Sequence, residues 1–368
     1  MSGDVLTVLH SESSLGWGGQ ENRILNEMIG LRELGHHSLV VCRPGARLAE
    51  RAREAGFQAF EVPMRNALDL AAVLRLRSLM RRSGAHIVNT HSGRDTQLAG
   101  MAARSLLTRR PRVVRTRHLA MPITSRFTYS VLPDHVVTVS DFVAGYLAQA
   151  GVPASHITTV PTGIDLERYQ PDPAGSTLRS ELGLAADTPL VGTVAILRRK
   201  KGHAELLEEV PHILARHPQA HFVFAGDGPQ KENLERRVAE LGLGARVHLL
   251  GLRRDVVNVL QALDLFVLPT HQEALGTAFI EAAAMGVPAV ATAVDGVPEA
   301  VLDGRTGLLV PPADGAALRS AIGDLLAAPE RRRAMGEAAR ERVRQRFSRR
   351  AMAAGMVDVY NRLLASAR

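Results

Sequence analysis

Short runs of β-branched and other apolar residues alternate with amphipathic stretches along nearly the whole chain. The runs predict strands, and the stretches of about 10–15 residues between them have helical spacing. The predicted strands form two series: Val5–Leu9, Leu39–Cys42, Phe57–Val62, His86–Thr90, Val113–Arg117 and His135–Val139, then Leu190–Ala195, His221–Ala225, Val247–Leu250, Leu265–Leu268 and Ala289–Ala293. Strands that alternate with helices pack as parallel sheets covered on both faces. The pattern therefore predicts an α/β fold.

The two series are separated by the turn-forming segment 170–175, which has the sequence Gln-Pro-Asp-Pro-Ala-Gly. We therefore predict two doubly wound, Rossmann-like domains, 1–168 and 188–346, joined by a linker over 169–187 and followed by a helix over 347–368. Ligands bind beyond the carboxyl ends of the strands in such sheets. Two domains of this kind predict a cleft between two such edges.

Composition narrows the class of protein. The chain has 368 residues, and its single cysteine, Cys42, excludes an internal disulfide and a cysteine-based zinc site. The longest apolar run, 282–294, is interrupted by Gly286 and Pro288 and is too short to span a bilayer. The N-terminus has no basic region before an apolar stretch, so we expect no signal peptide and a cytoplasmic protein.

The net charge of +8 is unevenly distributed. Between Leu70 and Arg117 there are 11 arginines and one acidic residue, Asp95. A guanidinium makes two parallel hydrogen bonds to phosphate, so this stretch is either a solvated arginine-rich surface or a face that binds an anionic partner. A nucleic-acid-binding module is disfavoured, because aromatic residues make up 4% of the chain and no basic–aromatic motif occurs.

A glycine-rich loop, residues 16–21, follows the first predicted strand and opens a helix that runs to about Leu34. Glycines and the N–H groups of a helix start allow a phosphate to approach the backbone. An NAD fingerprint would require a third glycine where Glu21 stands, which disfavours a dehydrogenase. A turn without a ligand remains an open alternative.

Four cations, Arg198, Arg199, Lys200 and Lys201, follow the strand Leu190–Ala195 directly. Like charges crowded at the end of a strand repel one another unless an anion neutralises them, and a diphosphate would do so. The alternative is an ordinary solvated run of charge.

The most specific segment is 269–281, which follows the strand Leu265–Leu268. We expect a helix to start near Gly276 or Thr277, so that the N–H groups of Gly276, Thr277 and Ala278 point at an anion. Glu281 lies one turn into this helix, where its carboxylate can accept hydrogen bonds from a ribose diol. Glu273 precedes the helix and can reach a sugar hydroxyl. A surface role for Glu273 and a capping role for Glu281 are the alternatives.

Two glutamates eight positions apart, followed by Ala-Ala-Ala-Met-Gly-Val-Pro-Ala-Val-Ala-Thr at 282–292, resemble the signature of glycosyltransferase family 4. The segments 161–165, 224–229 and 296–310 resemble the same family. This resemblance implies a GT-B architecture, with the final helix returning to the N-terminal domain. It also implies transfer of a sugar from a nucleotide-sugar donor with retention of the anomeric configuration.

The resemblance assigns expected roles by position. Arg198 and Lys201 look like the diphosphate-binding pair, Glu281 like the ribose ligand and Glu273 like the carboxylate that faces the donor sugar. His91 resembles the active-site histidine, and His118 is a weaker match. Gly18 and Gly19 match the glycines of the first loop. The chain departs from the family at Ile196, where many members have arginine, and His271 either touches the donor sugar or fills space.

No two aspartates lie two positions apart, so the Asp-x-Asp metal motif of other sugar transferases is absent, and we expect no metal and no cofactor. Retention by double displacement requires a carboxylate nucleophile. Asp95 and Asp141 are unsupported candidates, so a same-face displacement is favoured.

The expected partners are a nucleotide sugar, with UDP as the first candidate, and a lipid-linked or lipopolysaccharide-type anionic acceptor. Helix Leu70–Arg82 is consistent with peripheral contact to an anionic membrane. The remaining alternatives are a nucleotide-sugar epimerase of the same fold and a non-enzymatic basic binding protein.

Overall fold

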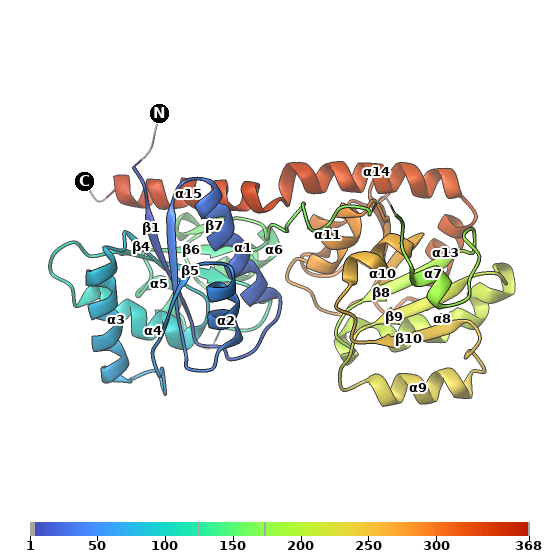
Figure 1. The fold of residues 1–368 in the computed structure, drawn as a ribbon, viewed down its shortest axis with the longest axis horizontal. Helices are drawn as coiled ribbons and strands as arrows, with labels where there is room; N and C mark the ends of the chain where they lie inside the picture. The colour runs from blue at the N-terminus through green and yellow to red at the C-terminus, as the bar shows by residue number, and fades with distance from the viewer. Residues whose placement is uncertain (1–3, 124, 173, 367–368) are drawn as a thin grey trace. The chain divides into compact units, whose positions relative to one another are not determined.

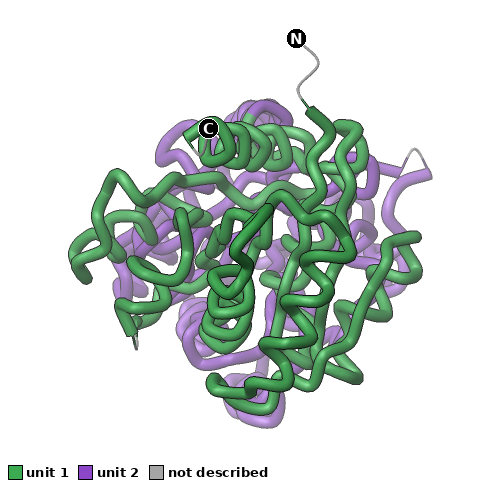
Figure 2. Tube along the Cα trace, turned by 90° about the vertical axis from the view of Figure 1, so that its left-hand side faces the viewer, with its two compact units in different colours: residues 1–164, 346–368 green, residues 165–345 purple. Residues whose placement is uncertain are grey.

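The structure is a computed structural model that describes residues 4–123, 125–172 and 174–366. The chain forms two compact units, coloured separately in Figure 2. Unit 1 consists of Met1–Ile164 and Arg346–Arg368, and unit 2 consists of Asp165–Gln345. Each unit contains one parallel sheet with helices packed against it (Figure 1).

The sheet of unit 1 has seven strands among the described residues, in the order β3-β2-β1-β4-β5-β6-β7. The strands are β1 Thr7–Glu12, β2 His37–Cys42, β3 Gln58–Glu61, β4 Ile87–Thr90, β5 Arg112–Arg117, β6 His135–Thr138 and β7 Ile157–Thr159. The helices are α1 Gly19–Glu33, α2 Arg47–Glu54, α3 Leu70–Ser83, α4 Gly93–Arg104, α5 Phe127–Ser130, α6 Asp141–Gln149 and α15 Arg349–Ala365.

Alternation along each strand places side chains on both faces of this sheet. Leu9 belongs to a cluster with α3 and α4, whereas its neighbour Val8 belongs to a cluster with α1 and α15, and both are fully buried. Helices α1 and α15 approach closely at Gly30, where a Cβ would come within 2.8 Å of the Ala353 side chain. Segment 349–365 therefore completes the core of unit 1.

The sheet of unit 2 has six strands in the described part of the chain, in the order β10-β9-β8-β11-β12-β13. The strands are β8 Leu190–Val194, β9 His221–Ala225, β10 Val247–Gly251, β11 Leu265–Leu268, β12 Ala289–Thr292 and β13 Gly307–Val310. The helices are α7 Leu178–Glu181, α8 His203–Arg216, α9 Lys231–Glu240, α10 Val256–Ala262, α11 Thr277–Ala284, α12 Val297–Ala300, α13 Gly315–Leu326 and α14 Pro329–Arg346. The prediction of two doubly wound parallel sheets is confirmed.

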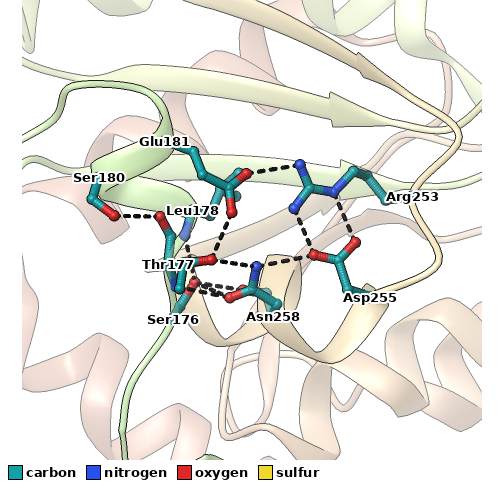
Figure 3. Close-up of polar contacts among 8 residues, drawn as sticks. All are labelled: Ser176, Thr177, Leu178, Ser180, Glu181, Arg253, Asp255 and Asn258. Carbon is teal, nitrogen blue, oxygen red and sulfur yellow. Dashed lines mark hydrogen bonds and ion pairs between the residues drawn. The ribbon is translucent and has the colours of Figure 1, made fainter.

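The segment predicted as a linker, 169–187, lies in unit 2. Pro173, in the predicted turn, is outside the described residues. A polar network fixes residues 176–181 to α10 and to the loop before it (Figure 3). Asn258 accepts from the backbone N–H of Thr177 at 2.9 Å and from the Ser176 hydroxyl at 2.9 Å. Arg253 bonds to Glu181 at 2.9 Å. These contacts make the start of α7 part of the unit.

Candidate active site

The order of strands in unit 2 brings two loops together. Strands β8 and β11 are neighbours although they are not consecutive, and in a doubly wound sheet ligands bind at such a switch point. The loop after β8 ends in a short 3₁₀ turn, Arg199–Lys201, and the loop after β11 leads to α11. The cationic run and the paired glutamates therefore lie at the same edge of one sheet.

Lys201 and Glu273 form an ion pair across these two loops. The Lys201 ammonium donates to the Glu273 carboxylate, and the two side chains are 17% and 20% exposed. Partial burial reduces solvent screening, so the attraction is stronger than between two surface groups. The structure thus joins a residue expected to bind diphosphate to a residue expected to face the donor sugar.

Further bonds hold the two loops in register. Lys200 O accepts from the His271 backbone N–H at 2.8 Å and from the Thr270 hydroxyl at 2.9 Å. The His271 ring also contacts Glu205, with 2.8 Å between Nε2 and Oε1. His271 therefore connects its loop to the first turn of α8.

Glu273 is positioned by a third loop, which follows β12. Its backbone N–H donates to the Asp295 carboxylate at 3.0 Å, and its carbonyl accepts from the Gly296 N–H at 3.0 Å. A Cβ at Gly296 would lie 2.0 Å from Ala274 O, so only glycine allows this approach. Asp295 was not among the site residues predicted from the sequence. An aspartate before a glycine at a strand end is a turn signal that could have indicated it.

Helix α11 starts where the sequence predicted. Its N-cap residue, Gly276, has a φ of 93°, a left-handed conformation that strains other residues. A Cβ there would also come within 2.6 Å of the Phe279 ring. The helix geometry leaves the first N–H groups, including those of Thr277 and Ala278, without an intrahelical acceptor. These N–H groups lie at the same edge of the sheet as Lys201, where the sequence predicted an anion site.

Glu281 lies on the first turns of α11, close to Tyr169. Burial raises the pKa of Glu281, while the Tyr169 hydroxyl and the nearby positive charge of Arg168 act in the opposite direction. Tyr169 itself is 8% exposed, and its pKa is raised by burial and by the glutamate. Tyr169 was not predicted from the sequence, because no local pattern connects it with α11.

Arg198 is exposed at the end of the loop that follows β8, and the side chain of Ile196 is 49% exposed. The loop after β9 supports this segment, because Leu197 N–H donates to Asp227 O at 3.0 Å. Gly228 permits this contact, since a Cβ there would be 2.6 Å from Leu197 O. The backbone beneath Arg198 is thus fixed while its guanidinium faces solvent.

In unit 1, three histidines form a hydrogen-bonded chain. His91 Nε2 lies 3.2 Å from His10 Nδ1, and His91 Nδ1 lies 3.0 Å from His118 Nε2. Strands β1, β4 and β5 are adjacent, which brings the three residues together. Burial lowers the pKa of all three rings, so each is neutral near pH 7. His10 and His91 are buried, and His118 is the more exposed member of the chain.

Asp95 and Asp141 differ in their surroundings. Asp95 is fully buried and caps α4, since it accepts from the backbone N–H groups of His91 and Ser92 at 2.8 Å each. Asp141 is an exposed residue in the first turn of α6. The geometry gives Asp95 a structural role in holding the backbone of His91.

Gly18 and Gly19 are at the start of α1. Glu21 accepts from the Gly18 N–H at 2.8 Å, which fixes the end of the loop. A Cβ at Gly19 would meet no atom of the described chain within 4 Å. The space beside this glycine is therefore open, as close approach by a ligand would require.

Two features are absent from the described residues. No group of three or more His, Cys, Asp or Glu side chains among them is arranged to hold a metal ion. No helix in the described part of the chain is long and apolar enough to cross a membrane.

Comparison with known proteins places this architecture in a class. Residues 17–168 match the family model described as Glycosyltransferase Family 4, and residues 176–342 match the model described as Glycosyl transferases group 1. A glycosyltransferase from Rickettsia africae has a similar fold, with a TM-score of 0.88 at 21% identity over 98% of this chain and 99% of that one. The two units thus have the fold of GT-B glycosyltransferases.

Two curated relatives are similar to this chain in sequence. A GDP-mannose-dependent alpha-(1-6)-phosphatidylinositol monomannoside mannosyltransferase from Mycolicibacterium smegmatis is 36% identical over 217 residues, which is 56% of each chain. The match thus spans about half the length of that relative. The protein of the same description from Mycobacterium tuberculosis is 30% identical over 364 residues, 91% of this chain and 92% of that one. The chain belongs to the family 4 glycosyltransferases, which confirms the resemblance found in the sequence.

Proposed function

We propose that the chain transfers a glycosyl group from a nucleotide-sugar donor to a lipid-linked acceptor. The observation that carries this proposal is the meeting of Lys201, Glu273 and the N-terminus of α11 at the switch point of one sheet. Unit 2 would bind the donor and unit 1 the acceptor.

Chemistry at the donor follows from the charges. Breaking a glycosyl–diphosphate bond develops negative charge on the leaving group. Lys201 and the N–H groups of Gly276, Thr277 and Ala278 would stabilise that charge, because they are held in place before the reaction. The exposed Arg198 would add a further positive charge. Glu281 would accept from the ribose hydroxyls. Glu273 would face the donor sugar, where a carboxylate also favours positive charge at the anomeric carbon.

For the donor, GDP-mannose is the first candidate to test, because the two relatives named above are described as GDP-mannose-dependent. This choice replaces the initial preference for UDP, which rested on no residue of the chain. Since these relatives are described as acting on a phosphatidylinositol monomannoside, a glycolipid of that kind is the first acceptor to test and replaces a lipopolysaccharide-type acceptor.

We expect the transfer reaction to retain the anomeric configuration of the sugar and to proceed without a metal ion. Because Asp95 is used by the cap of α4, we assign no covalent nucleophile. The acceptor hydroxyl would attack on the face that the diphosphate leaves, and a phosphate oxygen would take its proton. His91 would orient His118, whose partly exposed ring is the member of the histidine chain better placed to meet a substrate.

Peripheral contact with an anionic membrane is part of the proposal. Leu70 and Leu74 of α3 are 72% and 63% exposed, and Leu68 before the helix is 71% exposed. Arg75, Arg81 and Arg82 are exposed on the same helix. By contrast, Val73 and Leu76 of the same helix are buried in the core. Exposed leucines beside arginines fit the interface of an anionic leaflet.

The test is a transfer assay with the full chain, phosphatidylinositol monomannoside vesicles and GDP-mannose or UDP-glucose, with and without EDTA. A glycosylated lipid of retained anomeric configuration, formed equally in EDTA, is the expected product. A sugar isomer formed without acceptor would instead indicate an epimerase. Absence of turnover together with absence of binding to GDP and UDP would overturn the proposal and favour a binding protein.

A further inference from the structure

A buried polar network lies next to the histidine chain of unit 1. Asn89 of β4 stands two positions before His91 and therefore lies on the same face of the sheet. Thr116 of β5 has the same relation to His118. The Thr116 hydroxyl donates to Asn89 Oδ1 at 2.9 Å, and Asn89 Nδ2 donates to Glu27 Oε1 at 3.0 Å. The network thus connects α1, which carries Glu27, with the two strands that lead to the histidines.

The inner end of the histidine chain is His10 Nε2, which is buried and has no hydrogen-bond partner in the described part of the protein. His10 and Asn89 are paired in register across β1 and β4, so Glu27, which Asn89 contacts, lies beside His10. Glu27 Oε1 also accepts from the Tyr360 hydroxyl at 2.7 Å, whereas Oε2 is without a partner among the described residues. One helical turn before Glu27, the fully buried Arg23 has an unpaired Nε.

Three buried polar atoms of α1 and β1 therefore lack a partner within the described chain. Such groups are costly when unsatisfied, and proteins commonly satisfy them with an internal water. We propose that Glu27 is a positioning residue for the histidine chain, and that one buried water carries its hydrogen bond to His10. The water accepts from His10 Nε2 and Arg23 Nε and donates to Glu27 Oε2, which gives it a typical set of polar partners.

This arrangement sets the direction of every hydrogen bond in the histidine chain. A neutral imidazole has one N–H, so a ring that donates from one nitrogen accepts at the other. Since His10 donates from Nε2, its Nδ1 accepts from His91 Nε2, 3.2 Å away. His91 Nδ1 then accepts from His118 Nε2, 3.0 Å away. All three rings thus carry their proton on Nε2, and His118 has a lone pair on Nδ1.

The lone pair on His118 Nδ1 determines which substrate group this ring binds. It accepts a hydrogen bond from a hydroxyl, and it disfavours phosphate oxygens, which are acceptors themselves. With the opposite tautomer, His118 would donate and would favour phosphate. Glu27 touches no substrate and acts through His10 and His91. The binding of a sugar or acceptor hydroxyl rests on the proposed function, whereas the direction of the hydrogen bonds is a property of unit 1.

The first experiment measures the tautomers by NMR on the full chain labelled with 15N-histidine, with signals assigned by single variants of each histidine. In wild type near pH 7 we expect the proton on Nε2 of His10, His91 and His118. In Glu27→Gln the two bonds to Oε1 keep the amide oxygen in that place, so the amide nitrogen, which only donates, replaces Oε2. The water then donates to His10, the chain reverses, and all three rings carry their proton on Nδ1.

Tyr360→Phe is the matched control, because it removes one bond to Glu27 Oε1 from the same buried network and leaves the carboxylate in place. It should lower the midpoint of thermal unfolding and leave the three tautomers unchanged. Wild-type protein with the proton on Nδ1 of any of the three rings would overturn the inference, and this result needs no variant to fold. A folded Glu27→Gln protein with the wild-type tautomers would overturn it as well.

Transfer activity separates this inference from the proposed function. In the assay described above, Glu27→Gln should lower kcat/KM about tenfold, because one directed hydrogen bond to a substrate hydroxyl is lost, and should leave GDP binding unchanged. If wild type has the expected tautomers and transfers no sugar, the proposed function fails and the direction of the chain stands. If Glu27→Gln reverses the tautomers and transfers sugar at the wild-type rate, the proposed role of Glu27 in positioning His118 for substrate is wrong.

Discussion

Lys201 and Glu273 are 72 positions apart in the sequence and form an ion pair at the ends of two adjacent strands. This pair neutralises the lysine and restricts its rotation. If the function proposed above holds, the diphosphate of the donor has to compete with Glu273 for the same ammonium. The proposed function therefore predicts that the two residues have opposing effects on nucleotide affinity.

Substitution of each partner separates these effects. Lys201→Ala should weaken GDP binding about 10- to 100-fold, because a hydrogen bond to a charged group contributes about 1.5–3 kcal/mol. Glu273→Gln should leave GDP affinity unchanged or higher and lower kcat about 100-fold. Calorimetry and initial rates measure both. The exposed Lys231→Ala is the control for loss of one positive charge. If Glu273→Gln weakens GDP binding as much as Lys201→Ala, the competition described above does not occur.

Gly276→Ala should destabilise unit 2. Alanine at a φ of 93° is strained, and its Cβ would clash with Phe279, which together cost about 2 kcal/mol. The midpoint of thermal unfolding should fall by roughly 4–8 °C for a unit of this size. Gly244→Ala is the matched control, because a Cβ there meets nothing within 4 Å and it has no left-handed φ. Equal melting of the two variants would contradict the strain argument.

The histidine chain should make the stability of unit 1 depend on pH. The pKa values of His10, His91 and His118 are lower in the folded than in the unfolded chain. As the pH falls below about 6.5, the three histidines take up protons in the unfolded chain before they do so in the folded chain. The free energy of unfolding therefore decreases. His91→Gln should reduce that dependence by up to about 1.4 kcal/mol per pH unit.

Thermal unfolding from pH 5.5 to 7.5 measures this slope. Glu12, whose pKa burial raises to about 8, contributes a slope of opposite sign. It is present in wild type and variant, so it cancels in the difference. The exposed His212→Gln is the control. If His91→Gln shows the wild-type slope, the three histidines do not change their protonation on unfolding.

Membrane contact by α3 is testable by flotation with anionic vesicles at low salt. The double variant Leu70→Ser, Leu74→Ser should float less than wild type, because each exposed leucine contributes about 1–2 kcal/mol when it leaves water. Arg81→Gln with Arg82→Gln should lose about 1 kcal/mol per charge and become less sensitive to salt. Leu252→Ser is the control, since Leu252 is 72% exposed in unit 2. Wild-type protein that stays in the soluble fraction would remove membrane contact from the proposal.

The sequence predicted which strands are present better than it predicted the residues at which they end. The apolar pattern ended the first strand at Leu9, whereas β1 continues to Glu12. His10, Ser11 and Glu12 are polar and fully buried, so a pattern of apolar residues does not predict that they belong to the strand. Strands β7 and β13 were missed, because one has three residues and the other begins with a glycine. Buried polar residues at the ends of strands are typical of a sheet edge that forms a functional site.

The site was predictable as a set of residues and not as a set of contacts. Lys201, Glu273 and Glu281 stand in recognisable motifs. The partner of each depends on strand order and on loops far away in sequence, as Asp295 shows for Glu273. His118, the weaker match, lies within 3.0 Å of His91 because β4 and β5 are neighbours. Local patterns do not encode such distances.

The docking of α15 against α1 has a consequence for biosynthesis. Residues 165–345 are continuous and can complete unit 2 as soon as they leave the ribosome. Residues 1–164 are translated before unit 2 but lack Met352, Met356 and Tyr360 of their core until residues 349–365 are made. Until then the carboxylate of Glu27 also lacks the hydroxyl of Tyr360, which donates to it at 2.7 Å. Unit 1 therefore finishes folding after unit 2, although most of it is made earlier, and its apolar face stays uncovered while residues 165–345 are translated.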